Sequence, residues 1–185
     1  LNQVIKVKKN PLYWDADRVK LNEIHFLPID NVSREDFMFR SGQIHVTSSI
    51  PTEKIEVYKE EYPNNINISP YYGTYYYRIN LNKNPLDNKL IRQALSLSID
   101  REKITEKVAK GGQIPAFSFT PPDPNGYYPP TRLEFDPQKA KQLLTQAGYT
   151  DENLPTFELL YNTSEGHQKI AEAMQQMWKE TLGVN

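Results

Sequence analysis

The chain has 185 residues, of which 38% are hydrophobic and 24% are charged, so it is long enough to bury one large core or two small ones. With a net charge of -1, the chain has no excess of positive charge that would attract nucleic acid. No apolar run approaches the roughly 20 residues that a membrane-spanning helix needs. The lack of cysteine excludes disulfides, thiolate nucleophiles and cysteine-based zinc sites.

The first 72 residues alternate predicted strands and helices. Strands are expected where β-branched and aromatic residues cluster, at residues 4–7, 21–29, 43–49 and 65–69. Ser33 is predicted to cap a short helix that Gly42 ends, and Thr52 is predicted to cap a second helix. Trp14 is expected to be a packing anchor. Such alternation is typical of an α/β layer whose loops form one wall of a cleft.

An aromatic segment, TYYYRIN at residues 74–80, carries most of the functional argument. In a strand, alternate side chains point to opposite faces. Tyr75 shares a face with Ile79, which marks the core side. Tyr76 and Arg78 therefore point away from the core, into a groove or into solvent. The alternative is an ordinary half-buried strand, because tyrosine is a good strand former.

Four more helices are predicted from their first residues. Either Asp87 or Asn88 caps a core-facing helix, and Asp100 caps the next one, which Gly111 and Gly112 end. Pro137 begins a third helix, because its missing N–H has no partner in the first turn. Ser164 caps the last helix.

The region between the second and third of these helices is irregular. Residues 113–136 contain six prolines among five aromatics, which forbid regular structure and stiffen the backbone. An ordered surface loop is expected there. A further strand is predicted at residues 156–161.

No set of residues converges on catalysis. His167 beside Ser164 resembles a catalytic dyad only superficially, because Ser164 is better explained as a helix cap. The three histidines, His25, His45 and His167, share no metal-like spacing, so neither an enzyme nor a cofactor is expected. A nucleic-acid-binding module is the second function class considered, because tyrosines can stack on unpaired bases. The balance of acidic and basic residues argues against it.

Five stretches together resemble a known family, the periplasmic oligopeptide-binding proteins that serve ABC importers. In chain order they are KKNPLYWD, SGQIHVTSSIP, YYGTYYYRIN with the following LIRQALSLSIDREKI, QIPAFSFTPP and LYNTSEGH. The resemblance implies an α/β fold of the type II periplasmic-binding-protein kind, with mixed sheets, flanking helices and parts of two lobes. It assigns residues 1–72 to the first lobe and 73–185 to the second, and it identifies the chain as an internal fragment.

The function that this resemblance implies is capture of extracellular oligopeptides and their delivery to the membrane subunits of an ABC transporter, without a cofactor and without nucleic acid. The implied location is extracytoplasmic, in the periplasm or as a cell-surface lipoprotein, with membrane association only through an upstream anchor. A nickel, haem or pheromone ligand would look similar within the superfamily, so these alternatives stay open.

The resemblance also implies ligand-side residues, which are Tyr71, Gly73, Tyr76, Arg78, Ser48, Ser49, Asn162 and His167. Strand alternation selects Tyr76 and Arg78 as well. Gly73 stands where well-known members carry a cysteine, so the disulfide of those members cannot form here. Arg78 stands where they carry an acidic residue, and its positive charge is expected to favour acidic ligand side chains.

Overall fold

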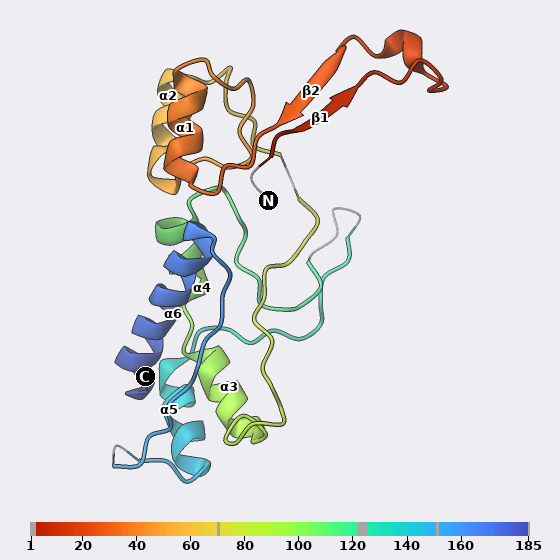
Figure 1. Ribbon diagram of the computed structural model, residues 1–185. Helices are drawn as coiled ribbons and strands as arrows, with labels where there is room; N and C mark the ends of the chain where they lie inside the picture. The colour runs from red at the N-terminus through yellow and green to blue at the C-terminus, as the bar shows by residue number, and fades with distance from the viewer. Residues whose placement is uncertain (1–2, 70, 122–125, 151, 185) are drawn as a thin grey trace. The chain divides into compact units, whose positions relative to one another are not determined.

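The computed structural model describes residues 3–69, 71–121, 126–150 and 152–184 (Figure 1). The chain forms two compact units, Leu1–Pro51 and Thr52–Asn185. Helices make up most of the regular structure, and the described sheet has two strands. None of the helices in these ranges combines the length and the hydrophobicity that crossing a bilayer requires.

A β-hairpin opens the first unit. Strand β1 (Ile5–Lys8) pairs antiparallel with β2 (Glu23–Phe26), and the connection contains the short 3-10 helix η1 (Ala16–Arg18). These strands confirm the first two predicted ones. Trp14 in the connection is 84% exposed, so the prediction that it anchors packing is wrong for the chain as described.

The first unit also contains helix α1 (Val32–Arg40). Its cap is Asn31, whose side-chain oxygen accepts a hydrogen bond from the N–H of Arg34, and Ser33 lies within the first turn instead. The prediction of Ser33 as the cap is therefore wrong by two positions, since asparagine caps as well as serine does. Gly42 follows the helix with φ +73, as expected of a glycine that ends a helix.

The second unit begins with the 3-10 helix η2 (Thr52–Lys54), which leads directly into α2 (Ile55–Glu61). Because that 3-10 turn precedes the helix, Lys54 occupies the cap position and makes no side-chain capping bond. Thr52 is thus not the cap that the sequence predicts.

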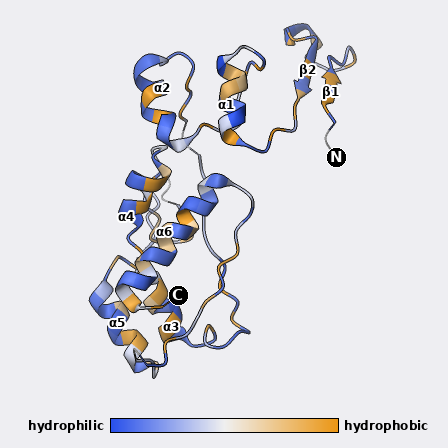
Figure 2. Ribbon diagram, turned by 60° about the vertical axis from the view of Figure 1, so that its left-hand side comes forward, coloured by the Kyte–Doolittle hydropathy of each residue, from blue (hydrophilic) through white to orange (hydrophobic). Residues whose placement is uncertain are grey.

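Three helices build the core of the second unit: α3 (Lys89–Leu97), α5 (Pro137–Gln146) and α6 (Glu165–Leu182). Their apolar side chains form one buried cluster, with Ile91, Ala94, Leu95, Leu97, Ala140, Leu143, Leu144, Leu182 and Val184. Figure 2 shows the hydrophobic faces of α3 and α5 in orange. The indole N–H of Trp178 on α6 donates to the carbonyl of Leu95 at 2.9 Å, which ties α6 to α3.

The predicted caps Asn88 and Ser164 are confirmed, because their side chains accept backbone N–H groups at the starts of α3 and α6. Pro137 begins α5 as predicted, and the side chain of the preceding Asp136, which was not predicted as a cap, accepts the N–H of Lys139. Asp100 caps α4 (Arg101–Lys103), which continues as the π-helix η3 (Ile104–Ala109). That segment ends at Lys110, which itself adopts the left-handed conformation, one residue before the glycines expected to end it.

Four predicted strands are not strands in the structure. Residues 43–49, 65–69, 74–80 and 156–161 contain no assigned strand. A strand is defined by hydrogen bonds to a neighbour, and these segments have no ladder partner in the part of the chain that the structure describes. Strand propensity indicates where a strand could form, but pairing depends on segments that the local sequence does not reveal.

Candidate functional site

Two tyrosines of the aromatic segment lie on the same side, as strand alternation predicts. The rings of Tyr75 and Tyr77 meet edge to face with centroids 5.5 Å apart, and their hydroxyls are hydrogen-bonded at 3.2 Å. Burial raises the pKa of the Tyr77 phenol well above its ordinary value, and the hydrogen bond with Tyr75 raises it further. Tyr77 is therefore neutral at physiological pH.

The start of α6 lies against this side of the segment. The imidazole of His167 stacks on Tyr75 with centroids 4.6 Å apart and an angle of 22° between the rings. Its Nδ1 lies 2.8 Å from the amide oxygen of Asn162. Because an amide oxygen only accepts, Nδ1 carries the hydrogen, and in the neutral ring Nε2 remains as an acceptor. The structure thus brings together two predicted site residues, Asn162 and His167.

Asn162 is positioned by the turn that precedes α6. Its side-chain oxygen also accepts the N–H of Ser164, which in turn caps the helix by accepting the N–H of His167. The imidazole is consequently fixed from both sides, by the stacking on Tyr75 and by the bond to Asn162. A ring held in this way loses little side-chain entropy when it binds a ligand.

Tyr76 points to the other side of the segment. Its ring meets that of Phe119 edge to face, with centroids 4.9 Å apart, and it remains 46% exposed. Arg78, two residues further along, is exposed and forms no ion pair within the described ranges. Both residues are thus accessible, but Tyr75 and Ile79, which were predicted to face the core, are also exposed, at 49% and 38%. The prediction that one side of the segment faces the core is therefore wrong for the chain as described.

Tyr71 and Gly73 lie where the segment bends. The N–H of Gly73 donates to the carbonyl of Tyr71 at 3.0 Å, which closes a tight three-residue turn, and the Tyr71 ring is 91% exposed. A Cβ at position 73 would collide with that ring, so any larger residue there would displace Tyr71. The glycine keeps the backbone accessible at this bend.

Ser48 and Ser49 belong to the first unit. The N–H and the hydroxyl of Ser48 both donate to the carboxylate of Glu35, at 2.7 and 3.0 Å. Glu35 is buried in the first turn of α1, where the helix dipole favours a negative charge. Ser48 therefore fixes its own loop to α1 and keeps only its oxygen lone pairs for a ligand, whereas Ser49 is exposed.

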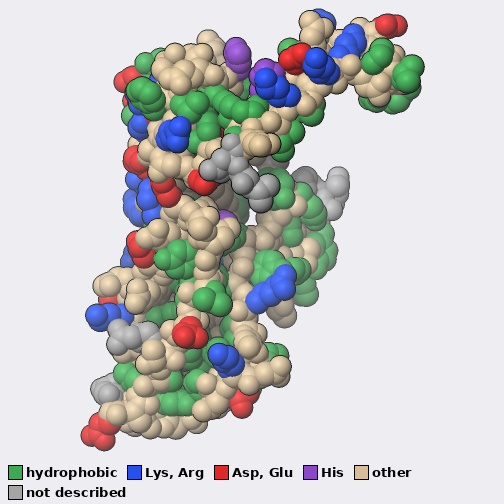
Figure 3. Space-filling view, in the orientation of Figure 1, with side chains coloured by type: hydrophobic (Ala, Val, Ile, Leu, Met, Phe, Trp, Pro, Cys, Tyr) green, Lys and Arg blue, Asp and Glu red, His purple; other side chains and the backbone are tan. Residues whose placement is uncertain are grey.

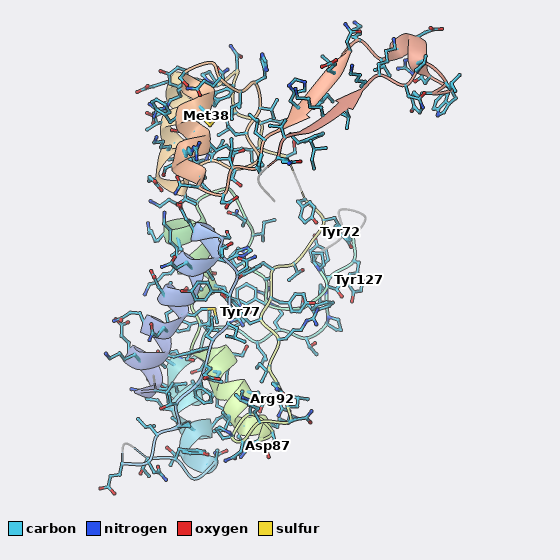
Figure 4. All side chains as sticks on the ribbon, in the orientation of Figure 1. Met38, Tyr72, Tyr77, Asp87, Arg92 and Tyr127 are labelled. Carbon is cyan, nitrogen blue, oxygen red and sulfur yellow. The ribbon has the colours of Figure 1, made fainter. Side chains whose placement is uncertain are left out.

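Arg92 on α3 is another arginine of this unit, and its guanidinium is engaged by backbone carbonyls. Its guanidinium donates to the carbonyls of Leu86 and Asp87, at 2.9 and 2.8 Å. Figure 4 shows Arg92 beside Asp87 at the start of α3. Arg92 thus stabilises the turn that enters the helix.

Two residues of this surface were not predicted as site residues. Tyr75 was assigned to the core side because it alternates with Ile79, yet it supports the His167 ring. Phe119 lies in the proline-rich loop, about forty residues from Tyr76 in sequence, and no local pattern links the two. The only available signal was the density of aromatic residues in both segments.

The chemistry of this surface is that of binding. Its groups are phenols, an imidazole, an amide, a guanidinium and an extended backbone, all of which form hydrogen bonds or stack. The described residues contain no cluster of three or more acidic, histidine or cysteine side chains that could hold a metal ion.

Comparison with known proteins defines the class. The chain belongs to the bacterial extracellular solute-binding proteins, family 5, whose middle region matches residues 1–185.

Individual relatives within this class are peptide-binding proteins. The chain is 40% identical to the periplasmic oligopeptide-binding protein OppA of Salmonella typhimurium, over 100% of this chain and 35% of that protein. The structure of the murein tripeptide-binding protein MppA of Escherichia coli matches 100% of this chain and 38% of its own, with a TM-score of 0.91 and 38% identity.

A third relative is Haemophilus influenzae OppA in complex with the peptide RPPGFSPFR, whose structure matches 100% of this chain and 38% of its own, with a TM-score of 0.84 and 34% identity. These similarities confirm the predicted family and the predicted periplasmic-binding-protein fold class. The chain spans about a third of the length of the curated relatives it matches.

Proposed function

We propose that this chain is part of a protein that captures oligopeptides outside the cytoplasm and delivers them to the membrane subunits of an ABC importer. The observation that carries the proposal is the aromatic segment, residues 71–80. It places an exposed tyrosine and an exposed arginine on a backbone without a ladder partner among the described residues. The family and the peptide complex of the H. influenzae relative support the same function.

The extended backbone explains how peptides of different sequence could bind. Along residues 74–79 the described part of the chain forms no backbone–backbone hydrogen bond, so these N–H and C=O groups can pair with the main chain of a peptide that is added as a strand. Main-chain pairing does not depend on the peptide's side chains. Selectivity then comes from the residues beside the backbone, Tyr76 and Arg78 on one side and His167 on the other.

The remaining predicted ligand contacts belong to this proposal. Tyr71 and Gly73 would contact the ligand at the bend, and Asn162 would orient His167. Ser48 and Ser49 remain proposed ligand contacts of the complete protein. No bond of the ligand is broken, since binding and release are sufficient for uptake. The assignment of residues 1–72 and 73–185 to two lobes of the complete protein is part of the same proposal.

Calorimetry of the full-length protein with a mixed pool of tri- to pentapeptides tests the function. We expect saturable binding of peptides and no binding of the same amino acids in free form. Haem, nickel and single-stranded DNA serve as the competing ligands in parallel titrations. Saturable binding of one of these, with no heat from the peptide pool, would contradict the proposal.

A further inference from the structure

Phe119 is a large apolar side chain that the fold leaves in contact with solvent. It is 68% exposed, on the proline-rich loop where other hydrophobic side chains also gather at the surface (Figure 3). Burying a phenylalanine side chain stabilises a fold, so its exposure forgoes a stabilisation that the core residues obtain. A single exposed apolar residue is common, however, and exposure alone indicates nothing.

The loop around Phe119 holds this ring in a defined place. The preceding aromatic residue, Phe117, is half-buried, and the guanidinium of Arg132 lies 4.4 Å from the centre of its ring. The N–H of Leu133 donates to the Phe117 carbonyl at 3.4 Å. The hydroxyl of Ser118 donates to the carbonyl of Thr120 at 2.9 Å, which bridges the residues on either side of Phe119. The ring is therefore presented by a braced segment.

Phe119 contacts Tyr76, a residue of the proposed peptide site. Its ring meets Tyr76 edge to face at 4.9 Å, and both rings keep accessible surface. Arg78 follows Tyr76 by two residues, which in an extended segment places it on the same side. The two rings thus form an apolar wall beside the backbone that would pair with the peptide.

We infer that Phe119 is a specificity-determining residue, whose exposed surface receives an aromatic side chain of the bound peptide. This inference rests on the proposed peptide-binding function. Aromatic rings pack edge to face or offset at 4.5–7 Å, and a ring already held by Tyr76 binds a third ring without first being ordered. A peptide with a phenylalanine at the matching position gains this contact, whereas an alanine there does not reach it.

The test uses four tripeptides, trialanine and three peptides in which a single phenylalanine occupies each position in turn. Their affinities are measured by calorimetry for the full-length wild-type protein, for Phe119→Ala and for Phe119→Leu. Tyr128→Ala is the matched control, because Tyr128 lies on the same loop, is 74% exposed and has no ring contact with Tyr76 within the described ranges.

We expect the wild-type protein to bind one phenylalanine peptide about three- to tenfold more tightly than trialanine, the range that an aromatic pair supplies. Phe119→Ala should abolish this preference, Phe119→Leu should retain part of it, and Tyr128→Ala should retain all of it. If the preference for a phenylalanine peptide survives in Phe119→Ala, or if the wild type shows no such preference, the inference about Phe119 is wrong while the proposed function still holds. Failure of the wild type to bind any of the four peptides overturns the proposed function with it.

Discussion

The helical cluster of the second unit and its aromatic segment use hydrophobic side chains in opposite ways. In α3, α5 and α6 these side chains are buried against one another, and each helix satisfies its own backbone hydrogen bonds. In residues 71–80 the tyrosines remain partly exposed and the backbone has no ladder among the described residues. Stability is therefore expected to reside in the first region and ligand recognition in the second.

The largest expected effect is on stability, in the helical cluster. Ile91 is completely buried, so Ile91→Ala should lower the free energy of unfolding by about 2–5 kcal/mol through lost burial and the cavity it leaves. Tyr71→Ala, in the aromatic segment, removes a side chain that is 91% exposed and should change the free energy of unfolding by less than about 0.5 kcal/mol. Urea denaturation of the full-length variants measures both changes in unfolding free energy. Equal losses of stability in the two variants would contradict the assignment of stability to the helical cluster.

The next effect concerns charge in the aromatic segment. Arg78→Glu reverses an exposed charge, so the ratio of affinities for an aspartate-containing and a lysine-containing peptide should shift by roughly tenfold toward the lysine peptide. Lys107→Glu, an equal reversal on η3, controls for the overall field of the protein. Competition binding gives both ratios, and the assignment of Arg78 fails if they move together or not at all.

A smaller effect is expected where the two regions meet, at the start of α6. Asn162→Ala and His167→Ala should each weaken peptide binding by about 1–1.5 kcal/mol. Asn162→Ala removes the hydrogen bond that holds the imidazole in place, and His167→Ala removes the imidazole itself. The double variant should lose less than the sum, since the residues act as one unit. Strictly additive losses in calorimetry would show that Asn162 does not act through His167.

The smallest effect is expected from a single hydroxyl. Tyr76→Phe keeps the edge-to-face contact with Phe119 and removes only the phenol oxygen, so peptide affinity should fall by about 0.5–1 kcal/mol if that oxygen bonds the ligand. Unfolding free energy should not change. An unaltered affinity would make Tyr76 a packing residue.

The fold was predictable where local chemistry is sufficient. Asn88 and Ser164 identify their helices because a capping side chain bonds to the helix that it begins. Asn31 shows the limit, since two equally good caps two residues apart cannot be ranked from sequence. The strands predicted at residues 74–80 and 156–161 are not assigned in the structure, because strand pairing depends on distant segments that local chemistry does not reveal.

The candidate site was predictable in part for the same reason. Alternation indicated that Tyr76 is accessible, and resemblance to the family indicated the pair formed by Asn162 and His167. The contacts of Tyr75 with His167 and of Phe119 with Tyr76 join residues far apart in the chain. Such contacts follow from tertiary packing and leave no local pattern in the sequence.

The most direct test of peptide binding identifies what the protein carries when it is isolated. Native mass spectrometry of the full-length protein, purified without denaturation, should release a mixture of short peptides. The mixture is expected to be diverse in sequence, because main-chain pairing does not select side chains, and to be enriched in acidic residues by Arg78. A stoichiometric haem, metal ion or other non-peptide ligand in their place would contradict the account.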